Sequence, residues 1–309
     1  MRISISFIAL YVCLIAVIPA QAYTINAWGR DEYGLCDVPA GDDFVDIAAG
    51  MVHNLAIRSD GSLAAWGWNN YGQCNIPAGN DFVEIAAGNT SSLALKSDGS
   101  LVAWGWNNDG QCNVPAGNDY VEIAARASHC IAIKGDGSLA AWGFNIYGQC
   151  NVPAGNDFAD IAAGGYHNLA LKSDGSLAAW GYNEYGACNV PAGDDFTDIA
   201  AGYEFNLAIK SDGSLAAWGR NDHGQCNVPV GNDFIAIGAG SFHGLALKSD
   251  GSLVAWGWND YGQCNVPAGN HFVAISAGLS HNLAIPEPSL FVMLSMGAVA
   301  LTFHRCRRR

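Results

Sequence analysis

Seven cysteines recur at a constant interval of 38 residues, and evenly spaced thiols suggest disulfides or a metal site. They are Cys36, Cys74, Cys112, Cys150, Cys188, Cys226 and Cys264. Equivalent positions on repeated units usually lie farther apart than the about 7 Å between Cα atoms that a disulfide allows. Cys130 has no counterpart in the other repeats and could pair locally. We expect mainly small buried apolar side chains, with disulfides or a metal site as alternatives.

Histidine and aspartate follow the same interval. The histidines are His53, His129, His167, His243 and His281, and the aspartates are Asp43, Asp81, Asp119, Asp157, Asp195 and Asp233. Ser91 and Phe205 replace two histidines, and a catalytic or metal-binding ring would not accept phenylalanine, so hydrogen bonds between strands are expected. His271 replaces the seventh aspartate. The aspartates precede a strand, where they suit turns, and calcium binding is the alternative.

A single active site needs asymmetry, which periodic residues do not supply. No nucleophile motif, phosphate-binding loop or isolated carboxylate pair stands out in the sequence. The sequence therefore predicts no catalytic residue, no cofactor and no metal ligand.

The repeats differ from one another in two sets of positions. Directly after each Trp-Gly stand Arg30, Trp68, Trp106, Phe144, Tyr182, Arg220 and Trp258, and three residues later stand Tyr33, Tyr71, Asp109, Tyr147, Tyr185, His223 and Tyr261. The second set includes Tyr166, Tyr203 and Phe242. Aromatic side chains in loops suit contact with a protein or a sugar. The candidate partner-binding residues are Trp68, Trp106, Phe144, Tyr182, Trp258, Tyr71, Tyr166, Tyr203 and Phe242, and packing between repeats is the alternative.

These positions belong to a period whose clearest marker is Trp-Gly, at Trp28, Trp66, Trp104, Trp142, Trp180, Trp218 and Trp256. Within a period, "DFVEIAAG", "HNLAIRS" and "SLAAWGW" have the composition and alternation of strands, and "SDGS" suits a hairpin turn. "GQCNVPAG" is expected to form a short fourth strand. No helix signal occurs in the period. The pattern predicts an all-β fold, a seven-bladed β-propeller of four-stranded antiparallel blades.

Asp-Gly occurs in only six of the seven periods. The final "HFVAISAGLSHNLAI" supplies two strands, and "YTINAWG" near the start supplies a third. Only the connecting turn is missing, so both chain ends should complete the last blade and close the ring without an open sheet edge. The predicted propeller domain is 23–285.

The two ends of the chain have the composition of targeting segments, and both are expected to be helical. Residues 1–22 form a predicted signal peptide with the small residues Ala20 and Ala22 before the cleavage point. Residues 286–309 contain Pro286, Glu287 and Pro288, then fifteen mostly apolar residues and an arginine-rich end. This tail resembles the PEP-CTERM sorting signal of bacteria, which implies processing by an exosortase-type enzyme. A plain membrane anchor at either end is the alternative.

The repeat itself resembles that of the regulator of chromosome condensation family. The shared landmarks are the Gly…His-x-Leu-Ala-Leu, Asp-Gly and Trp-Gly-x-Asn-x-x-Gly-Gln elements, present in "HNLAIRSDGSLAAWGWNNYGQ". The resemblance implies a propeller over residues 23–285. The segment Cys-Asn-Val-Pro-Ala-Gly departs from that family and is similar to the seven-bladed β-lactamase inhibitory proteins of actinobacteria. That second resemblance implies enzyme inhibition, and inhibitors of that kind use aromatic loop residues of one face.

Charge limits the classes of partner. Between Tyr23 and Ile285 the chain carries 27 acidic and 9 basic residues, a net charge of −18. Such a surface repels phosphate backbones, so no nucleic-acid partner is expected. We predict an exported, non-enzymatic binding or structural propeller at the cell surface, outer membrane or extracellular matrix of a bacterium, with membrane contact only through the tail before processing. The expected ligand is a protein or a polysaccharide. The alternatives are a secreted enzyme inhibitor and a polysaccharide-acting enzyme.

Overall fold

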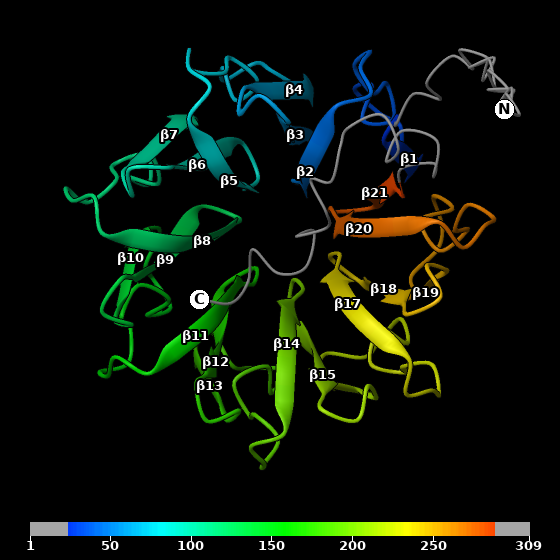
Figure 1. The fold of residues 1–309 in the computed structure, drawn as a ribbon. Coiled ribbons are helices and arrows are strands. Elements are labelled where there is room, and N and C mark those ends of the chain that lie inside the picture. The colour runs from blue at the N-terminus through cyan, green and yellow to red at the C-terminus, as the bar shows by residue number, and fades with distance from the viewer. Residues whose placement is uncertain (1–23, 288–309) are drawn as a thin grey trace, which may run out of the picture.

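The computed structural model describes residues 24–287, and within them every regular element is a β-strand. The strands form seven three-stranded antiparallel sheets arranged in a ring (Figure 1). The inner strands are β2 Phe44–Ala49, β5 Phe82–Ala87, β8 Tyr120–Arg126, β11 Phe158–Ala163, β14 Phe196–Ala201, β17 Phe234–Ala239 and β20 Phe272–Ala277. The middle strands are β3 His53–Arg58, β6 Ser91–Lys96, β9 His129–Lys134, β12 His167–Lys172, β15 Phe205–Lys210, β18 His243–Lys248 and β21 His281–Pro286. The outer strands are β4 Leu63–Gly67, β7 Leu101–Gly105, β10 Leu139–Gly143, β13 Leu177–Gly181, β16 Leu215–Gly219, β19 Leu253–Gly257 and β1 Asn26–Gly29.

Each sheet repeats the same register. In the first, His53 faces Gly67 across β3 and β4, and Phe44 faces Arg58 across β2 and β3. The Asp-Gly turn between β3 and β4 places Gly61 at φ +81°, and a side chain there would collide with the carbonyl oxygen of Asn80. This geometry explains why glycine follows aspartate in every complete turn.

Both ends of the described chain build one sheet. Its order is β1-β21-β20, with Trp28 of β1 facing Asn282 of β21. The predicted closure of the ring by the two chain ends is therefore confirmed. Strand β21 extends to Pro286, one residue beyond the predicted boundary of the domain.

The predicted fourth strand is wrong. The segment after Gln73 forms turns, in which the amides of Asn75 and Ile76 donate to the carbonyls of Gly72 and Cys74. The side chain of Asn69 accepts from the amide of Cys74 at 2.8 Å and donates to Asn75 Oδ1 at 2.9 Å. These side-chain bonds satisfy the backbone locally, and the following proline has no amide hydrogen for a sheet ladder.

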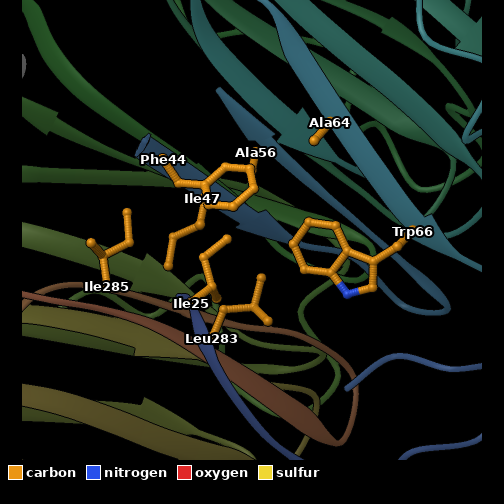
Figure 2. Packing of buried hydrophobic residues seen from close by; sticks show 8 residues of the cluster. All are labelled: Ile25, Phe44, Ile47, Ala56, Ala64, Trp66, Leu283 and Ile285. Carbon is orange, nitrogen blue, oxygen red and sulfur yellow. The ribbon is translucent and has the colours of Figure 1, made fainter. Parts of the chain in front are cut away.

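The hydrophobic core lies between neighbouring sheets. Figure 2 shows the junction between the last and the first sheet, where Ile25 and Leu283 pack against Phe44, Ile47 and the indole of the next sheet. That indole, Trp66, is 7% exposed, and its Nε1 donates to the carbonyl of Leu35 at 3.0 Å. Equivalent tryptophans donate to the preceding repeat at every junction, so each sheet is attached to its neighbour by packing and a hydrogen bond.

The predicted signal peptide, including Ala20 and Ala22, lies outside the described residues. The predicted apolar tail helix and Pro288 lie outside them as well, whereas Pro286 ends β21 and Glu287 follows it. No membrane-spanning helix occurs among residues 24–287.

Candidate functional site

The two variable sets of residues lie at the same end of the sheets. The loop between β2 and β3 and the loop after β4 meet there, because the amide of Trp68 donates to the carbonyl of Val52 at 2.8 Å. Gly67 directs the chain between them at φ +104°, and a side chain at this position would lie 2.8 Å from the same carbonyl. We call this side of the ring the aromatic face, and the side that carries the Asp-Gly turns the turn face.

The aromatic face has a rim of rings that contact each other from repeat to repeat. We call the residue directly after Trp-Gly the post-Trp-Gly residue. In each contact it meets a side chain of the preceding repeat, which stands three positions after that repeat's own post-Trp-Gly residue. The contacts are Tyr33–Trp68 at 6.0 Å, Tyr71–Trp106 at 4.3 Å, Tyr147–Tyr182 at 4.8 Å, His223–Trp258 at 6.1 Å, Tyr185–Arg220 at 4.8 Å and Tyr261–Arg30 at 5.2 Å, between ring centroids or from ring centroid to guanidinium. Asp109 takes the place of the ring at the seventh junction. The residues directly after Trp-Gly and those three positions later thus form one continuous rim with a single gap.

On one side of the ring the rim extends inward, toward the central channel that the inner strands line. Tyr166, Tyr203 and Phe242 come from three consecutive repeats, and Tyr203 donates its hydroxyl hydrogen to Tyr166 at 3.0 Å. Burial raises the pKa of Tyr203, and its bond to Tyr166 raises it further. We call Phe144, Tyr147, Tyr166, Tyr182, Tyr203 and Phe242 the aromatic patch; neighbouring rings in it lie 4.8–6.3 Å apart.

Two arginines belong to the rim, and both are neutralised by the chain itself. Arg220 lies over Tyr185 and Phe242, and it donates to Asp222 and Glu204, both at 2.7 Å. These carboxylates raise the pKa of Arg220, Asp222 most strongly. Arg30 likewise forms an ion pair with the carboxylate two residues further on, that of Glu32.

The candidate partner-binding residues are brought together on this one face. Trp68, Trp106, Phe144, Tyr182, Trp258, Tyr166, Tyr203 and Phe242 are half-buried, and Tyr71 is 45% exposed. Each ring therefore packs against a neighbour and also presents surface to solvent. The sequence-based selection omitted Tyr33, Tyr147, Tyr185 and Tyr261, which are 41–51% exposed in the same rim. Their position three residues after the post-Trp-Gly residue, which they share with Tyr71, was the sequence signal that could have identified them.

The recurring histidines are buried and join neighbouring sheets. Their Nε2 atoms bond to Ser92 Oγ or to asparagine Oδ1 of the next sheet, in the pairs His53–Ser92, His129–Asn168, His167–Asn206, His243–Asn282 and His281–Asn54, at 2.6–2.9 Å. Burial lowers the pKa of four of them to about 4 and that of His281 to about 3. The predicted hydrogen bonds between strands are confirmed, and these bonds connect different sheets.

The periodic cysteines are half-buried free thiols, so the expectation of buried side chains is met only in part. Each donates to a backbone carbonyl of the rim loop, as Cys74 does to Trp68 at 3.4 Å. Burial raises the pKa of these thiols to about 11. Cys130 is buried at the position of the interfacial asparagines and donates to the carbonyl of Gln111, while Ser91 stands at the position of the histidines in the preceding sheet.

The recurring aspartates form ion pairs on the turn face instead of closing turns with their side chains. The pairs are Asp43–Arg58, Asp81–Lys96, Asp119–Lys134, Asp157–Lys172, Asp195–Lys210 and Asp233–Lys248, at 2.6–3.9 Å. In the seventh sheet both positions of the ion pair are changed: His271 replaces the aspartate, and Pro286 replaces the lysine. Within residues 24–287 no three His, Cys, Asp or Glu side chains are arranged to hold a metal ion.

Comparison with known families identifies the repeat. Residues 44–73, 82–111, 158–187, 196–225 and 234–263 match the regulator of chromosome condensation (RCC1) repeat. The repeats of this chain are therefore similar to the RCC1 repeat. Each match begins at an inner strand and stops before the cysteine segment, where the sequence departs from the family.

Solved structures support an RCC1-like propeller. Prp20p of Saccharomyces cerevisiae, studied for its binding to Gsp1p and histones, has a TM-score of 0.74 at 19% identity, over 87% of this chain and 92% of its own. Human WBSCR16 has a TM-score of 0.75 at 16% sequence identity, over 87% of this chain and 100% of its own. The ectodomain of the Physcomitrella patens receptor kinase CR4 has a TM-score of 0.68 at 23% sequence identity, over 80% of this chain and 72% of its own. At these identities the likeness concerns the fold. No curated protein matches the chain.

Proposed function

We propose that this RCC1-like propeller is an exported, non-enzymatic binding protein whose aromatic face engages a protein partner. The observation that carries the proposal is the aromatic patch, because half-buried rings held by their neighbours offer large contact area at a small entropic cost. The patch also breaks the symmetry of the ring: aromatic residues follow the inner strand only at Tyr166, Tyr203 and Phe242. A polysaccharide is the other ligand class that such rings suit.

Protein binding is favoured by the relatives of the same fold. Prp20p is described as binding Gsp1p and histones, and a related structure has yeast RCC1 bound to Kap60. Export to the cell surface, outer membrane or extracellular matrix rests on the predicted signal peptide and on the tail that begins at Pro286. Processing by an exosortase-type enzyme rests on the resemblance of that tail to a sorting signal. The mass of the mature protein tests it, since a retained 286–309 segment would contradict processing.

A pull-down from cell-surface and matrix extracts tests the binding proposal. The bait is the exported chain, compared with a Tyr166→Ala and Phe242→Ala double variant. We expect the variant to lose a partner that the parent retains, because the two rings lie at either end of Tyr203 in the patch. Val230→Ala, which removes an exposed apolar side chain outside the patch, is the control. Equal recovery by parent and double variant would sink the proposal.

Enzyme inhibition is the second candidate. It rests on the similarity of the Gly-Gln-x-x-Val-Pro-Ala segment to β-lactamase inhibitory proteins, and this segment directly follows the rim. A panel of β-lactamases assayed with the exported protein at micromolar concentration decides between the two. An uninhibited panel would remove this candidate and leave the binding proposal in place. Turnover of a polysaccharide by the protein would instead favour an enzyme.

A further inference from the structure

The rim contains a cation site that the chain fills itself in two repeats. In these repeats an arginine follows Trp-Gly, lies over the tyrosine of the preceding repeat and meets a carboxylate two residues further on. Arg220 stacks over Tyr185 at 4.8 Å and binds Asp222 at 2.7 Å. The combination of ring and carboxylate is therefore suited to a cation, as the attraction of a guanidinium to an aromatic face predicts.

The same combination recurs where no arginine is present. In the repeat that follows Tyr147, the post-Trp-Gly residue is Tyr182 and the carboxylate two residues on is Glu184, which accepts the Tyr182 hydroxyl hydrogen. In the last complete repeat Asp260 follows Trp258, but the ring of the preceding repeat is His223 instead of a tyrosine. Asn70, Asn108 and Ile146 occupy the carboxylate position in the other repeats. The carboxylates thus gather on the side of the ring that also carries the aromatic patch.

Ring geometry at Tyr147 strengthens this reasoning. Tyr147, Tyr166 and Tyr182 are mutually inclined by 56–79°, with centroids 4.8–6.3 Å apart. Three steeply inclined rings beside a carboxylate resemble the walls of an aromatic cage, the arrangement that recognises alkylammonium and guanidinium groups.

Charge on the rest of the molecule favours the same class of ligand. Of the nine Lys and Arg residues in 24–287, six are paired with aspartate on the turn face, and Arg126 lies at the channel mouth. Only Arg30 and Arg220 lie in the rim, and each has its own carboxylate. An anionic polymer would meet a face with no unpaired cation in the rim, whereas a basic segment would meet rings and carboxylates.

We infer that the partner of the aromatic face presents arginine or lysine side chains, one of which binds at Tyr147, Tyr166, Tyr182 and Glu184. This inference rests on the proposed function and names the chemistry of its partner, a basic polypeptide segment. In this repeat Tyr182 stands at the position that Arg220 takes in the next one, so the positive charge beside the carboxylate comes from the partner.

Binding of two defined peptides to the full exported chain tests the inference. One peptide repeats Gly-Ser-Arg four times, and the other carries citrulline, which keeps the shape of arginine without its charge. We expect the arginine peptide to bind about tenfold more tightly. Glu184→Gln and Tyr147→Leu should each abolish most of that preference. Asp119→Asn removes one carboxylate from the turn face and is the matched control, expected to leave it unchanged.

The outcomes separate the inference from the proposed function. The cation site would be overturned if the two peptides bound equally, or if neither bound. It would also be overturned if Glu184→Gln and Asp119→Asn reduced the preference for the arginine peptide equally. A pulled-down partner that depends on Tyr166 and Phe242 but binds through a neutral or acidic segment would also overturn it, while the proposed function would stand. If no partner depends on these rings, the proposed function fails.

Discussion

Buried histidines join neighbouring sheets at five of the seven junctions, and at the other two both facing positions are changed. Where Phe205 replaces histidine, the facing residue of the next sheet is Gly244, which has no side chain to accept a hydrogen bond. Where Ser91 replaces histidine, the facing residue is Cys130. At each of these two junctions the histidine and the asparagine that would face it are both replaced. No buried asparagine is therefore left there without a histidine partner. The unexplained cysteine of the sequence is thus a packing residue.

The buried histidines predict a loss of stability in mild acid. In the unfolded chain an imidazole binds a proton below its ordinary pKa of about 6.5, whereas the folded protein keeps it neutral until about pH 4. The free energy of unfolding should therefore be highest above pH 6.5 and fall as the pH drops toward 4, by about 2 kcal/mol per histidine at pH 5. Urea unfolding followed by tryptophan fluorescence at several pH values measures this.

A double variant isolates one histidine. His167→Phe with Asn206→Gly copies the natural Phe205 and Gly244 pair. It should reduce the slope of unfolding free energy against pH between 6.5 and 4.5 by about 1.4 kcal/mol per pH unit. His223→Gln, which changes an exposed histidine of the rim, is the control variant. A double variant with the parent slope would show that these imidazoles do not control the acid response.

Thiol reactivity tests the burial of the periodic cysteines. Because burial raises the pKa of Cys74 and its equivalents to about 11, little thiolate forms near neutral pH. We expect the native protein to react with iodoacetamide about 100-fold more slowly than the urea-unfolded protein, with the modified sites counted by mass spectrometry. Cys74→Ser, which keeps the donor to Trp68, should fold normally. Rapid modification of the native thiols would contradict the structure.

Closure by β1 and β21 makes a prediction at the scale of elements. If only the turn is missing there, joining Ile285 to Thr24 through Lys-Ser-Asp-Gly restores the hairpin that Lys96–Gly99 forms elsewhere. Opening the chain between Asp136 and Gly137 then moves the termini to another surface turn. The permuted protein should fold with a Tm within about 5 °C of the parent 23–285 fragment, measured by circular dichroism. An aggregated permutant would show that the ring depends on its natural ends.

The strands and their closure could be predicted because the Trp-Gly period and the alternation along each strand are local signals. The fourth strand could not, since its residues have strand composition but Asn69 and Asn75 satisfy the backbone with their side chains. The rim contacts were equally hidden. Tyr71 and Trp106 belong to different repeats, and only the ring geometry brings them to 4.3 Å.

The two faces of the whole molecule carry different chemistry. The turn face has six partly exposed Asp–Lys and Asp–Arg pairs, each of which adds little stability because water screens it. The aromatic face has packed rings and carboxylates. The sequence could locate this asymmetry in the positions where repeats differ, but the assignment of both variable sets to one face required the hydrogen bond between Trp68 and Val52.

One residue connects sheets that are not neighbours. Arg126 ends β8 at the position where the other six repeats have glycine, from Gly50 to Gly278. It donates to the carbonyl of Ala239 at 2.8 Å and to that of Ala201 at 3.3 Å, across the channel. There it borders a cavity of about 50 Å³ that Tyr203 also lines. Figure 1 shows how far β8 lies from β14 and β17 around the ring.

Replacing Arg126 tests whether this bridge stabilises the ring as a unit. Burial lowers the pKa of Arg126 to about 10, so the side chain stays charged at neutral pH, and its two bonds to carbonyls are charge-assisted. Arg126→Gly, which restores the residue of the other repeats, should lower the free energy of unfolding by about 2 kcal/mol. Arg126→Met keeps most of the volume without the donors and should lose nearly as much, measured by urea unfolding at pH 7. If Arg126→Met matched the parent, the side chain would act by filling space, and the hydrogen bonds across the channel would contribute nothing to the stability of the ring.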